Sequence, residues 1–212
     1  MVLKNAYNLY DGLQKLGITN LRQQQEAPMQ AIFDGKDAIV LMPTAGGKSL
    51  LYQLPAVMDD TGKLTLVISP LKALQLDQVD ALRSKGIRAA VLNSDLSAAE
   101  HSSVLEDMTR RGGLLYLAPE QLQNMAVADA LRTANLTRIA VDEAHTLPQA
   151  KDDFRKAYGK VGSFIHSLPH RPQVIALTAT ATRNDVSRIR KSLGIPNAER
   201  FRTPLRRDNL HL

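Results

Sequence analysis

The stretch Asp37-Ala-Ile-Val-Leu-Met-Pro-Thr-Ala-Gly-Gly-Lys-Ser49 decides the fold of this chain. Its apolar run from Ala38 to Met42 predicts a buried strand, and Pro43 to Gly47 cannot continue that strand and must turn. The Leu-rich segment from Ser49 to Met58 then predicts a helix. A strand, a loop of small residues and a helix N-terminus in this order are typical of a phosphate-binding loop.

Each part of such a loop suits one part of a nucleotide. Backbone N–H groups from Ala45 to Ser49 would point at the phosphates, Lys48 would pair with the β and γ oxygens, and the Ser49 hydroxyl would hold Mg²⁺. The full pattern G-x-x-x-x-G-K-[ST] wants a glycine where this chain has Met42. An ordinary strand-to-helix turn therefore stays open until a second motif is found.

Composition limits the class of protein. The chain has 212 residues, 44% of them apolar and 23% charged, which suits one globular domain. No apolar run reaches the roughly 18 residues that cross a bilayer, and the first 16 residues predict an amphipathic helix and not a secretory signal. The absence of cysteine excludes disulfides and thiolate zinc sites. We therefore expect a cytoplasmic protein without membrane contact, associated with the nucleoid if it is bacterial.

The net charge of +6 is concentrated near the end of the chain. From Arg183 onward there are eight Arg or Lys against three acids, which leaves 19 against 18 in the preceding 182 residues. Basic side chains can neutralise the phosphates of a polyanion, or they can form a solvated helix face. The sequence leaves both interpretations open.

The rest of the chain alternates short apolar runs with helical patterns. Further strands are expected at 64–69, 89–92, 114–117, 138–141 and 173–177, and further helices at 6–16, 27–33, 71–82, 97–109, 120–132 and 182–193. Ser97 and Glu100 have the spacing of a capping box. Apolar runs without polar alternation indicate parallel strands covered on both faces. The sequence thus predicts an α/β domain with a mostly parallel sheet and helices on both faces.

The second motif is Asp142-Glu-Ala-His145, which follows the predicted strand 138–141. Because ligands gather at the carboxyl ends of parallel strands, these carboxylates and the phosphate loop are expected to face one crevice. Asp142 would then bind Mg²⁺ beside Ser49, and Glu143 would orient or deprotonate the attacking water. A solvated Asp-Glu pair is the alternative, which the preceding apolar strand and phosphate loop disfavour.

Six motifs in this order resemble those of the RecQ family of superfamily 2 DNA helicases. They are Leu21–Glu26, Met42–Ser49, Ser69–Val79, Tyr116–Glu120, Asp142–His145 and Leu177–Thr180. The resemblance implies a RecA-like P-loop domain, ATP and Mg²⁺ as cofactors, and single-stranded or partly duplex DNA as partner. Ser69–Ala73 and Thr178–Thr180 differ from the corresponding segments of DEAD-box RNA helicases, which favours DNA over RNA.

The resemblance also implies roles for single residues. Gln25 would hold the adenine edge and Arg22 would pack on the base, while Lys48 and Glu143 would be the catalytic pair. The implied nucleotide-binding set is Arg22, Gln25, Thr44, Ala45, Gly46, Gly47, Lys48, Ser49 and Asp142, with Ser49 and Asp142 as magnesium ligands. Contact with DNA, or its coupling to hydrolysis, is implied for His145, Phe154, Arg155, Thr178 and Thr180.

One departure from the RecQ pattern affects DNA binding. Where those proteins carry a Trp and a His after the Asp-Glu motif, this chain has Ala150 and Asp152. Since stacking is worth about 1–3 kcal/mol per base, the loss predicts weaker coupling of DNA to ATP hydrolysis. The sequence does not decide whether Tyr52 and Phe154 are core residues or functional residues.

The predicted organisation is one RecA-like lobe over residues 1–212. We expect helices and the adenine motif in 1–36, the core sheet in 37–202 and the start of a connection to a second RecA-like lobe in 203–212. The expected function is that of the first motor lobe of an ATP-dependent 3′→5′ DNA helicase. A non-catalytic nucleotide- or DNA-binding regulatory module and an RNA-dependent ATPase remain as alternatives.

Overall fold

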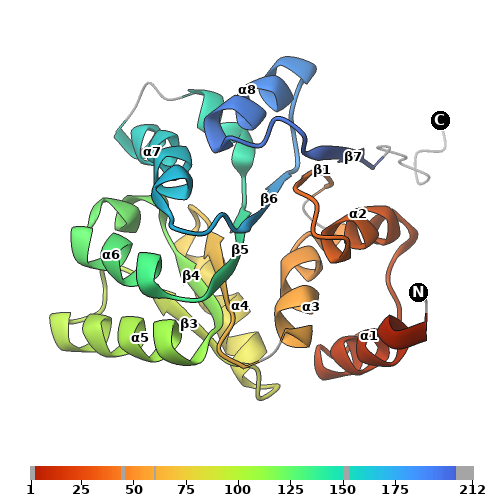
Figure 1. Cartoon of the computed structure of the whole chain (residues 1–212), viewed down its shortest axis with the longest axis horizontal. Helices are drawn as coiled ribbons and strands as arrows, with labels where there is room; N and C mark the ends of the chain where they lie inside the picture. Colours follow the sequence, from red (N-terminus) through yellow and green to blue (C-terminus); the bar gives the residue numbers. More distant parts are fainter. Residues whose placement is uncertain (1–2, 44–45, 60, 150–152, 204–212) are drawn as a thin grey trace, which may run out of the picture.

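The computed structural model describes residues 3–43, 46–59, 61–149 and 153–203, and its centre is a parallel sheet of seven strands (Figure 1). The order across the sheet is β3-β4-β2-β5-β6-β1-β7. The strands are β1 (Ala38–Leu41), β2 (Leu64–Ile68), β3 (Ala89–Leu92), β4 (Gly113–Leu117), β5 (Leu136–Val141), β6 (Gln173–Thr178) and β7 (Glu199–Arg202).

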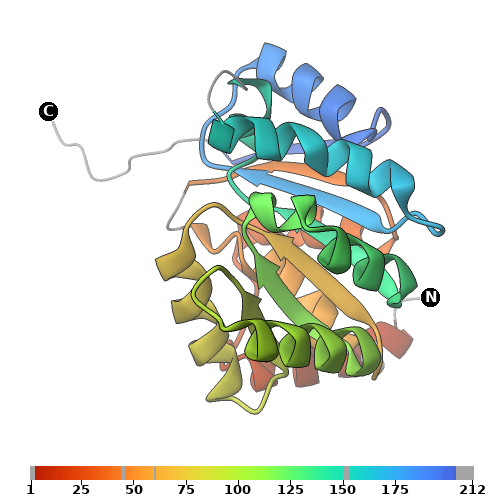
Figure 2. The ribbon, with the colours of Figure 1, turned by 90° about the vertical axis from the view of Figure 1, so that its left-hand side faces the viewer.

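Helices cover both faces of the sheet (Figures 1 and 2). One face carries α1 (Leu3–Lys15), α2 (Gln23–Phe33), α3 (Leu50–Met58) and α4 (Lys72–Arg83). The other carries α5 (Ala98–Arg111), α6 (Met125–Thr133), α7 (Asp153–Ser167) and α8 (Arg183–Leu193), with short 3₁₀ helices at Pro119–Gln123 and Ala144–Gln149. In the part of the chain that the structure describes, no helix is long and apolar enough to cross a bilayer.

The central strands are mostly apolar, and β1 is apolar at every position, because each has a core on both sides. In β1, Ile39 and Leu41 belong to the core under α5–α8, while Ala38 and Val40 belong to the core under α1–α4. All four residues are buried. Successive side chains of a strand point to opposite faces, so a strand between two helical layers has no solvated position to fill with a polar residue.

The predicted fold class is confirmed, and the expected strands and helices form with end shifts of a few residues. Ser97 caps α5 as predicted, since its hydroxyl accepts from Glu100 N at 3.3 Å and Glu100 Oε2 accepts from Ser97 N at 2.9 Å. Helix α2 begins at Gln23 and not at Ala27, so Pro28 lies inside the helix, and the stretch expected to be helical at 120–132 forms a 3₁₀ helix followed by α6 from Met125. The sheet is wholly parallel in its described pairings.

One α-helix and one strand were not predicted. Helix α7 follows the Asp-Glu motif, and β7 adds a short edge strand beside β1, with Ala38 opposite Glu199. The sequence of β7 is Glu199-Arg-Phe-Arg202, in which Phe201 is the one apolar residue. An edge strand is only partly buried and needs few apolar side chains. It brings Arg202 and Thr203 to the edge of the sheet where the phosphate loop lies.

Gly162 of α7 packs directly against the end of α8. A Cβ on Gly162 would overlap the backbone carbonyl oxygen of Ser192, which cannot move without shifting α8. We expect Gly162→Ala to lower the free energy of unfolding by about 2–3 kcal/mol in urea titrations. Gly12→Ala is the matched control, since its Cβ would meet only the flexible side chains of Met58 and Leu54. Equal losses in the two variants would contradict this account.

Candidate functional site

Three loops meet at the carboxyl edge of the sheet. Strands β5, β6 and β1 are neighbours in the sheet, and they end at Val141, Thr178 and Leu41. The loops that follow them carry the Asp-Glu motif, the Thr178–Thr180 segment and the phosphate loop. All three motifs were predicted from separate parts of the sequence, and the strand order places them side by side.

Close packing explains the residues of the phosphate loop. Met42 is fully buried and extends β1, because its N–H donates to Thr178 O at 3.0 Å. A Cβ on Gly46 would overlap Met42 Cγ, and a Cβ on Gly47, whose φ is +78°, would lie 2.5 Å from Gln25 Nε2. Met42, in the place of the expected glycine, therefore fills the space under the loop, and the two glycines leave room for it and for Gln25.

Gln25 links helix α2 to this loop. Its side chain is buried, its Nε2 donates to Gly47 O at 3.0 Å and to Gly46 O at 3.4 Å, and its Oε1 accepts from Arg22 N at 2.8 Å. Arg22 is the exposed N-cap residue of α2. The structure thus brings Gln25 onto the phosphate loop, with both ends of its carboxamide bonded within the chain. Adenine recognition by Gln25 and Arg22 stays a prediction.

Lys48 is the cation at the centre of the site. It is only 7% exposed, and its Nζ lies 3.7 Å from Glu143 Oε1. The Nζ atom has no hydrogen-bond partner within the described structure. A buried ammonium with unsatisfied donors at the mouth of a glycine loop is chemically suited to phosphate oxygens. The residues present therefore fit the phosphates of a nucleoside triphosphate.

Asp142 is an acid in an unfavourable environment. Burial raises the pKa of its carboxyl, the Lys48 ammonium opposes that rise, and the neighbouring Glu143 carboxylate adds to it. The N–H of Glu143 donates to Asp142 Oδ1 at 3.0 Å. The desolvation of Asp142 outweighs its attraction to Lys48, so a further cation at this point would be stabilised.

Glu143 adopts a backbone conformation that is rare for a residue with a side chain. Its φ is +50°, in the left-handed region, and its carbonyl oxygen accepts from Thr146 N at 3.0 Å and from Thr146 Oγ1 at 2.9 Å. Such strain persists where surrounding structure enforces it and is concentrated at functional sites. Here it accompanies a carboxylate that faces both Lys48 and His145.

His145 joins the acids to the loop after β6. Its Nδ1 lies 3.2 Å from Glu143 Oε2 and 3.0 Å from Thr178 Oγ1. The Thr178 hydroxyl donates to Thr180 O at 2.9 Å, so its single hydrogen is already used. The hydrogen between His145 and Thr178 then belongs to Nδ1, which donates to Thr178 Oγ1 while it faces Glu143 Oε2. This contact links the predicted coupling residues His145, Thr178 and Thr180.

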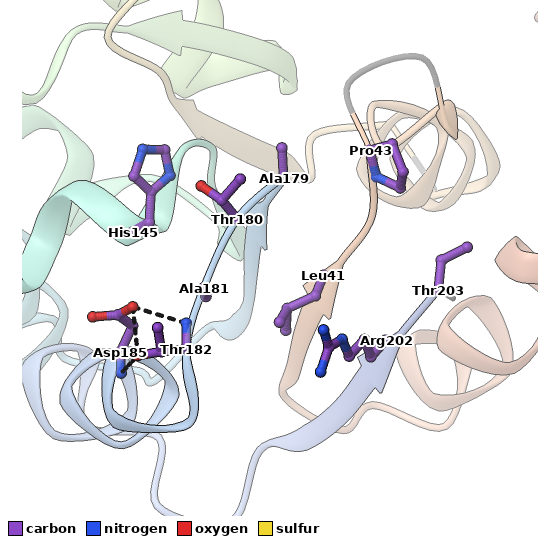
Figure 3. Close-up of a pocket in the computed structure, with 10 residues that line it drawn as sticks. All are labelled: Leu41, Pro43, His145, Ala179, Thr180, Ala181, Thr182, Asp185, Arg202 and Thr203. Atoms are coloured by element: carbon purple, nitrogen blue, oxygen red, sulfur yellow. Dashed lines mark hydrogen bonds between the residues drawn. The ribbon is translucent and has the colours of Figure 1, made fainter. Parts of the chain in front are cut away.

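A pocket of about 440 Å³ lies beside these residues (Figure 3). His145 and Thr180 line one part of it, and Asp185 of α8 and Arg202 of β7 approach it from opposite sides (Figure 3). Asp185 accepts from Thr182 N and Oγ1, both at 2.8 Å, and these bonds hold the pKa of its carboxyl below the ordinary value. Asp185 and Arg202 were not predicted as site residues, since their positions depend on how α8 and β7 pack.

The remaining predicted residues are only partly located. Ser49 precedes α3, and its carbonyl oxygen accepts from Tyr52 N at 3.2 Å. Phe154 and Arg155 lie at the start of α7, but their side chains are outside the described structure, as are Thr44 and Ala45. The altered loop positions Ala150 and Asp152 are also outside it.

No cluster of three or more acidic, His or Cys side chains suited to a metal occurs among the described residues. Magnesium is commonly held by one or two protein ligands together with phosphates and water. Ser49 and Asp142 therefore stay predictions as magnesium ligands.

Comparison with known proteins identifies the family. The DEAD/DEAH box helicase family model matches residues 22–189, and the chain belongs to this family. It is 40% identical over 200 residues to the probable ATP-dependent DNA helicase RecS of Bacillus subtilis, covering 94% of this chain and 40% of that protein. It is 38% identical over 217 residues to the ATP-dependent DNA helicase RecQ of Synechocystis sp., covering 99% and 45%. The chain thus spans less than half the length of these relatives.

Solved structures of other proteins share this fold. The helicase domain of Pyrococcus furiosus Hef matches with a TM-score of 0.68 at 23% identity, over 91% of this chain and 39% of that one. At this identity the match concerns the fold alone, and it confirms the predicted RecA-like α/β fold. The resemblance to RecQ proteins seen in the motifs is confirmed by the sequence matches.

The environment of Asp142 predicts that it destabilises the fold. A carboxyl whose pKa is raised on folding favours the protonated form, so its ionisation costs stability as pH rises through the carboxyl range. We expect Asp142→Asn to raise the free energy of unfolding by about 0.5–2 kcal/mol at pH 7. The gain should fade as the pH falls through the raised pKa of Asp142 and should be gone below about 4, the ordinary carboxyl pKa, where both states are protonated.

Urea titrations at several pH values test this expectation. Asp95→Asn is the control, because the side chain of Asp95 is 66% exposed and its loss should change stability by less than about 0.5 kcal/mol. A loss of stability in Asp142→Asn at pH 7 would show that attraction to Lys48 outweighs the cost of burial.

Proposed function

We propose that this chain is the first motor lobe of an ATP-dependent 3′→5′ DNA helicase of RecQ type, acting on single-stranded or partly duplex DNA in the cytoplasm. The buried Lys48 ammonium carries the proposal, because it lies between a glycine loop and Glu143 and none of the described residues accepts a hydrogen bond from it. Membership of the DEAD/DEAH box family implies nucleotide use. The names of the RecS and RecQ relatives support DNA as the partner.

Each residue of the site has a proposed task. Lys48 and the backbone of Gly46 and Gly47 hold the phosphates, and Ser49 and Asp142 hold Mg²⁺. The metal, when bound, offsets the negative charge of the phosphates during transfer. Glu143 accepts a proton from the attacking water, and its carboxylate is already turned toward Lys48. His145 and Thr178 connect Glu143 to the segment that ends at Thr180.

The proposal includes a second RecA-like lobe, reached through residues 203–212, that completes the site. In enzymes of this chemistry an arginine finger is worth about 10³–10⁵ in rate. The site described here offers Lys48 as its buried cation, and Arg202 is exposed on β7. We therefore expect this lobe alone to bind nucleotide and to hydrolyse it slowly.

The first test is the contribution of Lys48 to nucleotide affinity. We expect Lys48→Ala to weaken binding of a fluorescent ATP analogue with Mg²⁺ by at least about tenfold, since hydrogen bonds to charged groups are worth about 1.5–3 kcal/mol. Lys36→Ala removes the same charge from a side chain that pairs with Glu199 at 2.7 Å and is 52% exposed, and it should leave affinity unchanged. Unchanged affinity in Lys48→Ala would overturn the assignment of the site.

The second test separates binding from chemistry. Glu143→Gln removes the carboxylate that competes for the Lys48 ammonium, so nucleotide affinity should equal or exceed that of the native chain. The same variant should reduce ATP hydrolysis, measured at low salt with and without single-stranded DNA, by at least about 10². Full hydrolysis by Glu143→Gln would exclude its role as the base. Tight nucleotide binding without ATP hydrolysis in the native chain, with or without DNA, would favour a non-catalytic regulatory module.

A further inference from the structure

A second pocket, of about 290 Å³, lies where strands β2, β3 and β4 begin, on the edge of the sheet opposite to the phosphate loop. The ends of α1, α3 and α5 and the loop between α4 and β3 surround it. Five cations line this basic pocket: Lys15, Lys63, Lys85, Arg88 and Arg111. Asp59 is the one acid among the described residues of its wall. Positive charge thus gathers here, although the first 182 residues of the sequence are nearly neutral overall.

Two arginines of the basic pocket are held by a carboxylate that does not line it. Arg88 Nη1 lies 3.0 Å from Asp107 Oδ2, and Arg111 Nε lies 2.9 Å from Asp107 Oδ1. A guanidinium carries five N–H donors, so one shared carboxylate leaves donors on both side chains for a further anion. Asp107 therefore positions both arginines and leaves the pocket open.

The lysines of the basic pocket are positioned by the end of α1. Lys85 Nζ donates to Leu16 O at 2.7 Å, which attaches the loop before β3 to the residue that follows this helix. An ammonium has three hydrogens, so Lys85 keeps two of them for another acceptor. Lys15 is exposed in the last turn of α1. The cations of the pocket therefore come from segments that are distant in sequence and are brought together by tertiary contacts.

The acid in the wall of the basic pocket offsets little of this charge. Asp59 Oδ2 pairs at 2.9 Å with Nη1 of Arg138, a buried cation that does not line the pocket, and Asp59 Oδ1 lies 3.8 Å from Lys63 Nζ. Because Asp59 is shared with another cation, the side chains around the pocket keep an excess of positive charge. Such an excess repels itself and attracts anions.

Apolar residues complete the wall of the basic pocket. They are Ala56, Val57, Ile87 and Leu114, of which Leu114 is buried and the others are half-buried. A poorly hydrated wall strengthens the attraction between opposite charges. The volume corresponds to about ten water molecules at about 30 Å³ each, which suits a small anion.

We propose that the basic pocket binds an oligophosphate anion, either free or as the phosphate end of a nucleotide, at a site separate from the phosphate loop. Cations on several segments suit an anion that carries more than one phosphate group, since each group can accept from a different side chain. The bound anion relieves the repulsion among the cations. The inference goes beyond the proposed function, because it requires neither ATP hydrolysis nor DNA.

Calorimetric titration with inorganic diphosphate tests the proposal in the Lys48→Ala protein, whose phosphate loop has lost its cation. At low salt, where exposed charges are weakly screened, we expect a dissociation constant below about 1 mM. Lys15→Gln and Arg111→Gln, added singly to this background, should each weaken binding by about 3- to 10-fold, and together by at least about tenfold. Asp107 keeps its contact with Arg88 in the Arg111 variant.

Lys191→Gln and Arg132→Gln are the matched controls. They remove the same charges from the last turns of α8 and α6, and Arg132 pairs with Asp129 as Arg111 pairs with Asp107. Each control should change the affinity for diphosphate by less than about twofold. The absence of diphosphate binding, or an equal loss in pocket and control variants, would overturn the proposal.

Two further ligands identify the source of the anion. If Arg111→Gln weakens ADP binding in the same background as strongly as diphosphate binding, the pocket takes the phosphate end of a nucleotide, whereas a loss confined to diphosphate indicates a free anion. Either result supports the site. If the pocket substitutions weaken a single-stranded oligonucleotide while diphosphate does not bind, the surface takes a nucleic acid backbone and the proposal is wrong. Nucleotide binding through Lys48, measured separately, is unaffected by any of these results.

Discussion

The site depends on one electrostatic arrangement, the buried ammonium of Lys48 beside the carboxylates of Asp142 and Glu143. Taking these charges out of water costs several kcal/mol per ion, and an ion pair at 3.7 Å with no hydrogen bond recovers only part of it. The surrounding structure has to hold them in place. It does so with adjacent strands β1, β5 and β6, whose main-chain ladders fix the ends of the loops. The stability of the sheet thus supports a locally unfavourable, preorganised site.

The main features of the fold were readable from local sequence because local and global preferences agree. Continuous apolar runs predict strands with a core on both sides, and Ser97 caps its helix through its own side chain. Strand β7 was missed because an edge strand needs few apolar residues, and Glu199-Arg-Phe-Arg202 has no distinctive pattern. Helix α7, between the Asp-Glu motif and β6, was also not predicted. Tertiary packing decides the structure of β7, whereas α7 has a helical apolar pattern, with Val161, Phe164 and Ile165 buried at i, i+3 and i+4.

Within the site, too, some features follow from local sequence and others depend on tertiary packing. The presence of Lys48, Asp142 and Glu143 at loop positions followed from the motifs, since each motif comes at the end of a predicted strand. The contact of Gln25 with Gly47 O, the left-handed backbone of Glu143 and the approach of Asp185 to the pocket did not. These features join segments that are distant in sequence, and neither residue type nor local pattern predicts them. Met42 is instructive, because it departs from the loop pattern in sequence yet fills the space beneath Gly46 in three dimensions.

The two faces of the sheet differ in a way that bears on mechanism. The core under α5–α8 is built from aliphatic residues and Phe164, whereas the face under α1–α4 also holds Tyr52 and Tyr116 with their polar partners. At the opposite end of β5, Arg138 pairs with Asp59 at 2.9 Å and donates to Gln173 and Thr65. Buried polar contacts add little net stability, but each is satisfied in only one arrangement of its elements. A face that fixes its helices in this way can transmit a small displacement, because a shift that breaks one bond leaves a buried group unsatisfied.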